Sequence, residues 1–414
     1  MLVASEPRGH APRRAVTAPL SYAAAFVATL ALLSGPARAV TVRAAETDLR
    51  SDTERMISYR HQEHMWQTAD GALHLVFNRG SLQPNPGLAL YSSFDGGATW
   101  SFMQSFGNTD DKSTADGQLR GDELALVHAT ADGSIMYAEL HYDAELRQWS
   151  LVRSETAYSS AQWGGLNPAL DVDAVGTVWC AFVARNRETN DTNIRVVDRV
   201  GGGTLWTDPG LVFGPTDHRS IERSARPLRT ANGIGMIFTV REMTYWASRV
   251  DGLPDNSAWN TVTVFTGTPE QSFKDPYASH FSLVADAQNA LHLTIVDSYD
   301  ILYLRSPDGG TSWTAPVRLD DDRKAVYSQI GLANGKLAVA FSAQRGRGVL
   351  TVSADQGGSF SPADELALPP ASPGVSYGTA RVEMPTRSTG ALSVLQQYED
   401  NGVQRLMLFR LPSP

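Results

Sequence analysis

Three eight-residue segments of nearly the same sequence constrain the fold of this chain more than any other feature. Each starts with Ser, has Asp two positions later and Gly-Gly soon after it, and ends with Trp or Phe. Each follows a short apolar run, and Ser, Asp and Gly are the residues that form tight turns between strands. The pattern predicts three equivalent β-hairpin turns, each with a buried aromatic residue at its end. The segments cover residues 93–100, 306–313 and 353–360.

Weaker copies of this pattern extend it along the chain with a period of roughly fifty residues. Trp149, Trp206 and Trp259 continue the series of closing aromatic residues. A second signal, a turn followed by an alternating apolar strand, occurs in seven places, and repeats of short strands at this spacing are typical of β-propellers. The sequence therefore predicts an all-β, seven-bladed β-propeller of four-stranded blades, with six blades as the alternative. The seven turns lie at residues 70–71, 132–133, 175–176, 232–233, 288–289, 334–335 and 389–390.

The first 39 residues are typical of a signal peptide. Arginines precede an apolar stretch at residues 22–33, and Ala37-Arg38-Ala39 supplies the small residues that a signal peptidase recognises. We expect cleavage after Ala39 and a secreted or periplasmic protein, with Arg13-Arg14 leaving the twin-arginine route open as an alternative. The apolar stretch is shorter than the roughly 20 residues of a spanning helix, so we expect no membrane span.

Residues 40–414 are expected to form a single propeller domain. The last repeat lacks an outer strand after residues 406–409, and residues 40–58 belong to no repeat. A ring of blades leaves no open sheet edge if one end of the chain completes the blade that the other end forms. We therefore expect the N-terminal segment to pair into the final blade and close the ring.

The charge and cysteine content exclude several classes of function. The chain has 35 Lys and Arg against 44 Asp and Glu, a net charge of −9. Residues 1–39 carry four Arg and one Glu, so −9 minus 3 leaves −12 for the rest. Binding to nucleic-acid phosphates needs a basic surface, so we expect no nucleic-acid partner. Cys180 is the only cysteine, which excludes a disulfide framework within the chain and a cysteine zinc site. We expect a monomer without a cofactor, and the acidic runs at 110–111 and 320–322 are the candidates for a structural calcium ion.

Functional residues are expected at one mouth of the central channel, where the residues that precede each alternating strand would meet. Arg, His, Glu and Tyr are frequent among them, which suits an anionic or polyhydroxylated ligand. These candidates are Arg60, His61, Glu63 and His64; Arg120, Asp122 and Glu123; Trp163 and Asn167; Glu222, Arg223 and Arg226; Tyr277 and His280; Tyr327 and Gln329; and Tyr377 and Arg381.

The eight-residue segments resemble the Asp-box, or BNR, repeat of sialidases and related β-propellers. Four other segments are similar to the sialidase blades that carry functional residues. They are Tyr59-Arg60 with the strand at 72–77, Glu222 with the strand at 236–241, the segment 344–350 before the third turn, and Ser376-Tyr377 with residues 398–400. The resemblance implies an exported exo-glycosidase that acts on acidic glycans.

The resemblance also implies a set of substrate-binding residues. Sialidases hold the carboxylate of the sugar with three arginines. The positions that match are Arg60, Arg241, and an arginine of the segment 344–350, either Arg345 or Arg347. Glu399 matches the glutamate that orients the first of these arginines.

The implied catalytic residues are Tyr377 and Glu222. By the resemblance, Glu222 draws the proton from Tyr377, and the phenolate attacks the anomeric carbon, where positive charge develops in the transition state. A sialidase also has an aspartate acid/base in its first blade, and residues 78–85 contain no aspartate. His61 or Glu63 is the expected substitute, because each precedes the first alternating strand.

Two other functions are compatible with the sequence. The segment 167–173 resembles a blade of seven-bladed propeller lyases that act on uronic-acid glycans, in which Tyr or His removes a sugar proton. The turns alone are equally compatible with a noncatalytic glycan-binding propeller. Product analysis separates the three alternatives, because a hydrolase releases a free sugar, a lyase forms a new double bond, and a binding module changes nothing.

Overall fold

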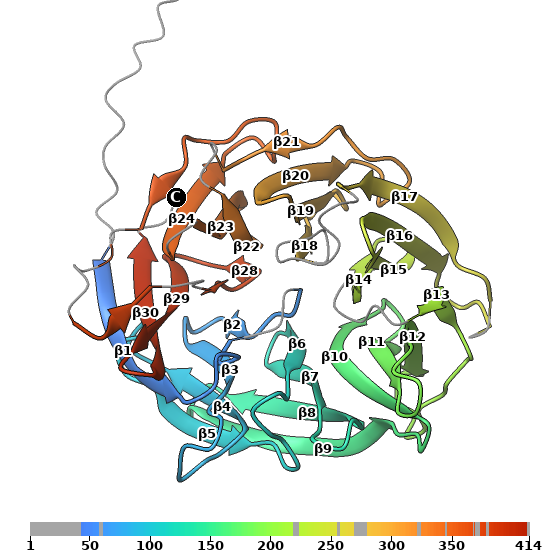
Figure 1. The fold of residues 1–414 in the computed structure, drawn as a ribbon, viewed down its shortest axis with the longest axis horizontal. Helices are drawn as coiled ribbons and strands as arrows, with labels where there is room; N and C mark the ends of the chain where they lie inside the picture. Colours follow the sequence, from blue (N-terminus) through green and yellow to red (C-terminus); the bar gives the residue numbers. More distant parts are fainter. Residues whose placement is uncertain are drawn as a thin grey trace, which may run out of the picture. The chain divides into compact units, whose positions relative to one another are not determined.

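The computed structural model describes residues 43–411, except for 58–60, 218–222, 255–256, 269–279, 321–323, 344–345, 367, 369–372 and 378–380. The described residues form seven sheets arranged in a ring about one axis (Figure 1). Every regular element among them is a strand, so the prediction of an all-β, seven-bladed propeller is confirmed. In this part of the chain, no helix has the length and apolar character needed to cross a bilayer.

Blades 1 to 3 each contain four strands, which run from the axis to the rim in chain order. Blade 1 is β2 (Met65–Gln67), β3 (Leu73–Asn78), β4 (Leu88–Ser93) and β5 (Ser101–Ser105); blade 2 is β6 (Ala115–Arg120), β7 (Glu123–Ala129), β8 (Ile135–Asp143) and β9 (Gln148–Tyr158); blade 3 is β10 (Trp163–Val172), β11 (Val178–Asn186), β12 (Thr192–Arg199) and β13 (Val212–Asp217).

Blades 4 to 6 repeat this order. Blade 4 is β14 (Arg223–Thr230), β15 (Gly233–Val240), β16 (Met243–Val250) and β17 (Asn260–Thr266); blade 5 is β18 (Phe281–Ala285), β19 (Leu291–Asp297), β20 (Asp300–Ser306) and β21 (Val317–Arg318); blade 6 is β22 (Ala325–Ala333), β23 (Lys336–Ala343), β24 (Arg347–Ser353) and β25 (Asp364–Glu365), with β28 (Arg387–Ser388) parallel to β22.

Blade 7 combines strands from the two ends of the described chain. Its inner part is β26 (Val375–Ser376) and β27 (Val382–Glu383), followed outward by β29 (Leu392–Asp400), β30 (Val403–Leu411) and β1 (Arg43–Ser51). β1 pairs antiparallel with β30, and the hydroxyl of Thr47 donates a hydrogen bond to the carbonyl of Leu406 at 2.9 Å. Leu49 is buried in the core between blades 7 and 1. The edge of β30 is therefore covered by a strand rather than exposed to solvent.

The apolar runs that are most conspicuous in the sequence form the second strands of the blades. The prediction that they are the inner strands, next to the axis, is therefore wrong. A second strand such as β15 is buried along its whole length, because it lies between two strands of its own sheet and between two neighbouring blades. The inner strands precede them and include polar residues. The candidates expected at one mouth are consequently spread along the channel, with Arg226 inside β14 and Arg120 at the end of β6.

The channel has two different mouths, because equivalent inner strands of a propeller run in the same direction along the axis. β28, which joins the sheet of blade 6, runs parallel to the inner strand β22 and so has the same direction along the axis. We call the mouth where the inner strands begin the start mouth and the other the end mouth. The last residues of β6, β10, β14 and β18 lie around one pocket at the end mouth.

The three repeated segments, here called the rim turns (residues 93–100, 306–313 and 353–360), join the third and fourth strands of blades 1, 5 and 6. In the first, the hydroxyl of Ser93 accepts a hydrogen bond from the Gly97 amide at 2.7 Å, and Asp95 accepts one from the Thr99 amide at 3.0 Å. The other two turns have the same bonds. The closing Trp100 is buried, so the turn also holds the outer strands on the core.

Candidate functional site

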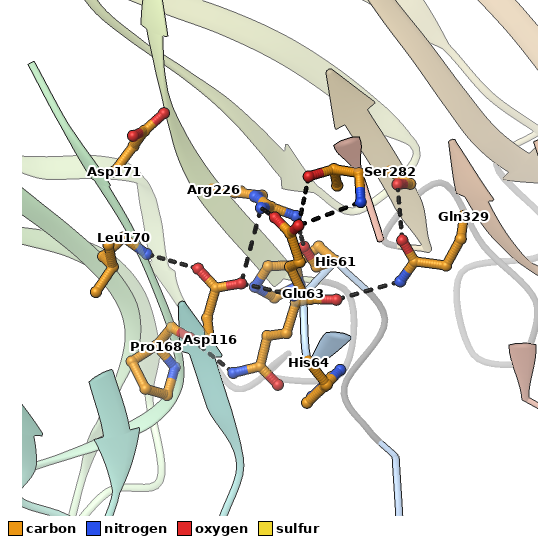
Figure 2. Close-up of polar contacts among 12 residues, drawn as sticks. His61, Glu63, His64, Asp116, Pro168, Leu170, Asp171, Arg226, Ser282 and Gln329 are labelled. Carbon is orange, nitrogen blue, oxygen red and sulfur yellow. Dashed lines mark hydrogen bonds and ion pairs between the residues drawn. The ribbon is translucent and has the colours of Figure 1, made fainter. Parts of the chain in front are cut away.

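The centre of the ring is occupied by a short segment of the chain itself. Residues 61–64, here called the axial segment, come just before β2 and lie across the channel (Figure 2). The side-chain Nε2 of Gln62 donates a hydrogen bond to the backbone carbonyl of Pro168 in blade 3 at 2.7 Å. The backbone carbonyl of Gln62 accepts one from the side-chain amide of Gln329 in blade 6 at 3.2 Å. Gln62 thus links blades 3 and 6, which are not neighbours in the ring.

The remaining residues of the axial segment extend these connections to all six other blades. The Glu63 amide donates to Asp116 in blade 2 at 2.6 Å. The His64 amide donates to Glu383 in blade 7 at 3.0 Å, and its ring Nδ1 lies 3.1 Å from the second oxygen of the same carboxylate. The ring of His61 stacks on Phe281 in blade 5 with centroids 5.4 Å apart.

Arg226 in blade 4 completes the cluster and is its main positive charge. Its Nη2 lies 2.8 Å from Glu63 Oε2 and 3.9 Å from Asp116 Oδ1, and its Nη1 donates to the carbonyl of His61 at 3.0 Å. Asp171 adds a third buried carboxylate, which accepts hydrogen bonds from the Val172 and Arg229 amides. Three carboxylates therefore share the field of one guanidinium.

Burial, with a smaller contribution from the Asp116 carboxylate, favours a proton on Glu63. Burial away from water raises the pKa of Glu63 to about 7, although Arg226 and a hydrogen bond from Thr386 oppose the shift. Burial likewise raises the pKa of Asp116 and of Asp171 above the usual range. The same carboxylates raise the pKa of Arg226, against the effect of its own burial, so the guanidinium stays charged. Glu63 is thus a carboxyl group that can hold or release a proton near neutral pH.

A pocket of about 440 Å³ opens beside this cluster at the end mouth, and Glu63 forms part of its wall. Three exposed arginines from different blades also line it: Arg120, Arg229 and Arg387. Arg387 is fixed by a hydrogen bond of 2.6 Å from its Nη2 to the carbonyl of Ala285. We call this the arginine pocket; its wall contains four arginines, Arg226 included, and three acidic residues, Glu63, Asp171 and Asp286.

Several residues predicted from the sequence lie elsewhere. Arg241 forms an ion pair with Asp217 at 3.1 Å, and Arg347 forms an exposed pair with Glu365 at 3.0 Å. Tyr377 packs against Tyr398 in blade 7 with ring centroids 5.9 Å apart, and burial together with nearby Glu46 raises its pKa. Glu399 accepts a hydrogen bond from Gln404 at 3.2 Å. These contacts do not bring Tyr377, Arg241 or Arg347 to the axial segment, where His61 and Glu63 lie.

The start mouth is only partly described. The predicted site residues Arg60, Glu222 and Arg345 lie outside the described residues, so the proposed pairing of Glu222 with Tyr377 stays a prediction. Other candidates do meet there: the ring of His280 lies 5.0 Å from that of Tyr327, and the guanidinium of Arg381 lies 5.5 Å from the Tyr327 ring centroid.

Two of the calcium candidates, Asp110 and Asp320, are engaged in other contacts. Both carboxylate oxygens of Asp320 accept hydrogen bonds from Arg318, and Asp110 accepts bonds from the amide of Lys112 and the hydroxyl of Ser113 within its own loop. Asp321 and Asp322 lie outside the described residues. No group of three metal-binding side chains occurs in the part of the chain that the structure describes.

Sequence reasoning missed Arg229 and Arg387. Arg387 belongs to β28, a two-residue strand that leaves no apolar pattern. Arg229 is the last but one residue of β14 and comes shortly before a turn, as Arg120 does at the end of β6. A search for arginines directly before the turn into each alternating strand would have found both Arg120 and Arg229.

The comparisons with known proteins give similarity to solved propeller structures. No family model matches the sequence, and no curated protein matches it by sequence. The Aleuria aurantia lectin has 11% identity over 75% of this chain and 96% of that one, with a TM-score of 0.46. The Trypanosoma rangeli sialidase has 11% identity over 84% and 54%, with a TM-score of 0.45. The α-L-arabinofuranosidase of Fusarium graminearum has 10% identity over 89% and 97%, with a TM-score of 0.43. Similarities at this level define neither a family nor a function for the chain.

Proposed function

We propose that this protein binds a carboxylate-bearing saccharide in the arginine pocket. The observation that carries the proposal is the convergence of Arg120, Arg229 and Arg387, from three separate blades, on one pocket of an acidic protein. A guanidinium matches a carboxylate with two parallel hydrogen bonds, and three of them in one pocket select an anion over a neutral ligand. Neither Arg120 nor Arg229 forms an ion pair within the described residues, so both are available to a ligand.

The rest of the pocket wall suits a sugar ring. The side chains of Gln118 and Asn289 supply amide groups for hydroxyls, while Leu119 and Leu228 supply apolar surface for the C–H face of a ring. The volume of about 440 Å³ lies in the range of small-ligand pockets. Carbohydrate recognition combines these elements, with a charged group for orientation and amides for the hydroxyls.

A second candidate function, hydrolysis of the bound saccharide, is favoured by Glu63. Glu63 belongs to the pocket wall, and the pKa of its carboxyl group is raised to about 7, which suits a general acid that protonates a leaving oxygen. Glu63 is one of the two acid/base candidates expected from the sequence. A sialidase-like reaction with Tyr377 as nucleophile and Glu222 as its base is the finer form of this candidate, and it depends on the start mouth.

Binding is tested with N-acetylneuraminic acid and glucuronic acid by calorimetry against the protein and the Arg229→Ala variant. We expect Arg229→Ala to weaken binding about tenfold, because it removes one charge-assisted pair of hydrogen bonds. Arg185→Ala is the matched control, since Arg185 is exposed in blade 3 and its side chain donates hydrogen bonds to Asn190 of the same blade. Loss of binding in Arg347→Ala with full binding in Arg229→Ala would instead place the carboxylate among the arginines predicted from the sequence.

Catalysis is tested by product analysis on sialylated and uronic-acid glycans. A released free sugar supports the hydrolase, an unsaturated product identifies a lyase, and binding without turnover leaves a binding module. If Glu63 is the general acid, Glu63→Gln lowers turnover at least a hundredfold while the affinity for the monosaccharide is retained. Tyr377→Phe is assayed in parallel: a similar loss in that variant would move catalysis to the start mouth.

A further inference from the structure

A second pocket of about 440 Å³ adjoins the arginine pocket at the end mouth. Asp286, Ala287 and Arg387 belong to the walls of both pockets, so the two hollows meet along these residues. The second pocket extends over the ends of blades 1, 5 and 6. The two adjoining pockets together offer more room than the arginine pocket alone.

The chemistry of the second pocket differs from that of the first. Its polar side chains are mainly neutral amides and hydroxyls, from Gln67, Gln288, Gln356, Asn334, Ser388 and Thr389. Gln67 accepts a hydrogen bond from the Thr389 amide with its Oε1, and its Nε2 makes no hydrogen bond with a described residue. Gln356 donates to Gln288 at 3.4 Å, which holds these two amides side by side. We call this the amide pocket; amides of this kind bind the hydroxyls of a neutral sugar.

Asp286 determines which unit of a ligand can lie at the junction. One of its oxygens accepts amide bonds from Gln288 and Ala290, and the other lies 3.2 Å from Nε2 of His292. Burial lowers the pKa of His292, so this imidazole is neutral near pH 7 and leaves the negative charge of Asp286 in place. A carboxylate beside Asp286 would be repelled, whereas the hydroxyls of a neutral sugar could donate hydrogen bonds to it.

We propose that the ligand is an oligosaccharide that spans both pockets, with an acidic unit in the arginine pocket and the adjoining neutral unit in the amide pocket. This inference rests on the proposed function, because it assumes that the arginine pocket holds the acidic sugar. It differs from recognition of a terminal acidic monosaccharide, for which the arginine pocket alone would suffice. Arg387 lies where the two units join and contacts both of them.

Two matched pairs of ligands test the proposal by calorimetry. They are N-acetylneuraminic acid with 3′-sialyllactose, and glucuronic acid with a hyaluronan tetrasaccharide, in which acidic and neutral units alternate. We expect at least one of the two longer ligands to bind about tenfold more tightly than its monosaccharide. Gln67→Ala and Gln288→Ala should reduce this gain to less than about threefold and leave the monosaccharide affinity within about twofold. Gln148→Ala, at an exposed position of β9 on the outer rim, is the control and should change neither affinity.

The outcomes separate this inference from the function on which it rests. If the monosaccharides bind and depend on Arg229, but the longer ligands bind no more tightly, the oligosaccharide inference is wrong and the proposed function stands. The same holds if Gln67→Ala and Gln288→Ala, with wild-type melting temperatures, leave the gain intact. If none of the four ligands binds, or if Arg229→Ala changes nothing, the proposed function fails and this inference fails with it.

Discussion

The axial segment and the rim turns are both irregular backbone whose polar groups form hydrogen bonds. They differ in how far apart along the chain the bonded residues lie. In a rim turn each of these bonds joins residues two to four positions apart, such as Asp95 with Thr99. In the axial segment one backbone bond, from Val76 to His64, joins residues 12 positions apart, and the others join residues from 52 to 323 positions apart, the longest from Thr386 to Glu63. The rim turns lie at the exposed periphery, whereas His61, Gln62, Glu63 and His64 are all buried.

This difference has an energetic consequence. A rim turn that loses one bond can exchange it for water, so each bond contributes little to stability. The polar groups of the axial segment are almost completely buried, so water replaces a lost partner less readily there than in a rim turn. The two regions should therefore respond very differently to single substitutions, and the order of the predictions below follows the expected size of the effect.

The largest effect is expected for Arg226→Met. The substitution leaves Glu63 and Asp116 without their cation in a buried site, and we expect the free energy of unfolding to fall by about 3–5 kcal/mol. Chemical denaturation monitored by tryptophan fluorescence gives this value. The double variant Arg226→Met with Glu63→Gln should recover part of the loss, because one of the two unpaired charges is then absent. A loss below about 1 kcal/mol for Arg226→Met would show that the contacts of Arg226 with Glu63 and Asp116 contribute little to stability.

The second prediction concerns pH. Because the pKa of Glu63 is raised to about 7 in the folded protein, above its ordinary value of 4.5, the folded state holds a proton that the unfolded chain releases first. The free energy of unfolding should therefore decrease as the pH rises from about 5 to 7, by roughly 1–3 kcal/mol. Glu63→Gln should lose this part of the slope. Equal slopes for the wild type and the variant would mean that Glu63 does not carry the proton.

A smaller effect is expected for Asp95→Ala in the first rim turn. The change removes the acceptor for the Thr99 amide and hydroxyl and for the Ser93 hydroxyl. Thr99 is exposed and can bond to water, and only the Ser93 hydroxyl is buried, so we expect a loss of about 1–2 kcal/mol. Asp95→Asn keeps one acceptor oxygen and should cost less. Thermal denaturation provides the comparison, and a loss as large as that of Arg226→Met would remove the contrast between rim and axis.

The smallest effect is expected for Arg347→Ala. Its pair with Glu365 is exposed on both sides, so solvent screens the attraction and the change in free energy of unfolding should stay within about 0.5 kcal/mol. Raising the salt concentration should reduce even this difference. A substantially larger loss would indicate that Arg347 has a structural role beyond this exposed pair.

The contrast also explains how much the sequence could predict. The rim turns are visible because every contact of Asp95 or Asp308 lies within one eight-residue segment. The number of blades could be predicted from seven apolar runs, because a second strand that is buried on both faces is apolar along its whole length. His61, Glu63 and Arg226 could be marked as candidates, but the contacts of His61 with Phe281 and of Glu63 with Arg226 could not be predicted, since no local pattern relates residues so far apart. For the same reason the arginine pocket, which collects the ends of separate strands, was not predicted.

The place of β1 in blade 7 has a consequence for the time course of folding. Thr47 bonds to Leu406 across 359 positions of the chain, so the first strand finds its partner only after nearly everything else has been synthesised. At synthesis rates of about 5–20 residues per second, β1 waits roughly 20–70 s with its backbone groups unpaired. During that interval any other strand edge is a competitor, including the same unfilled edge of β30 on a second molecule. Exchange of β1 between two copies would then be the characteristic folding error of this ring.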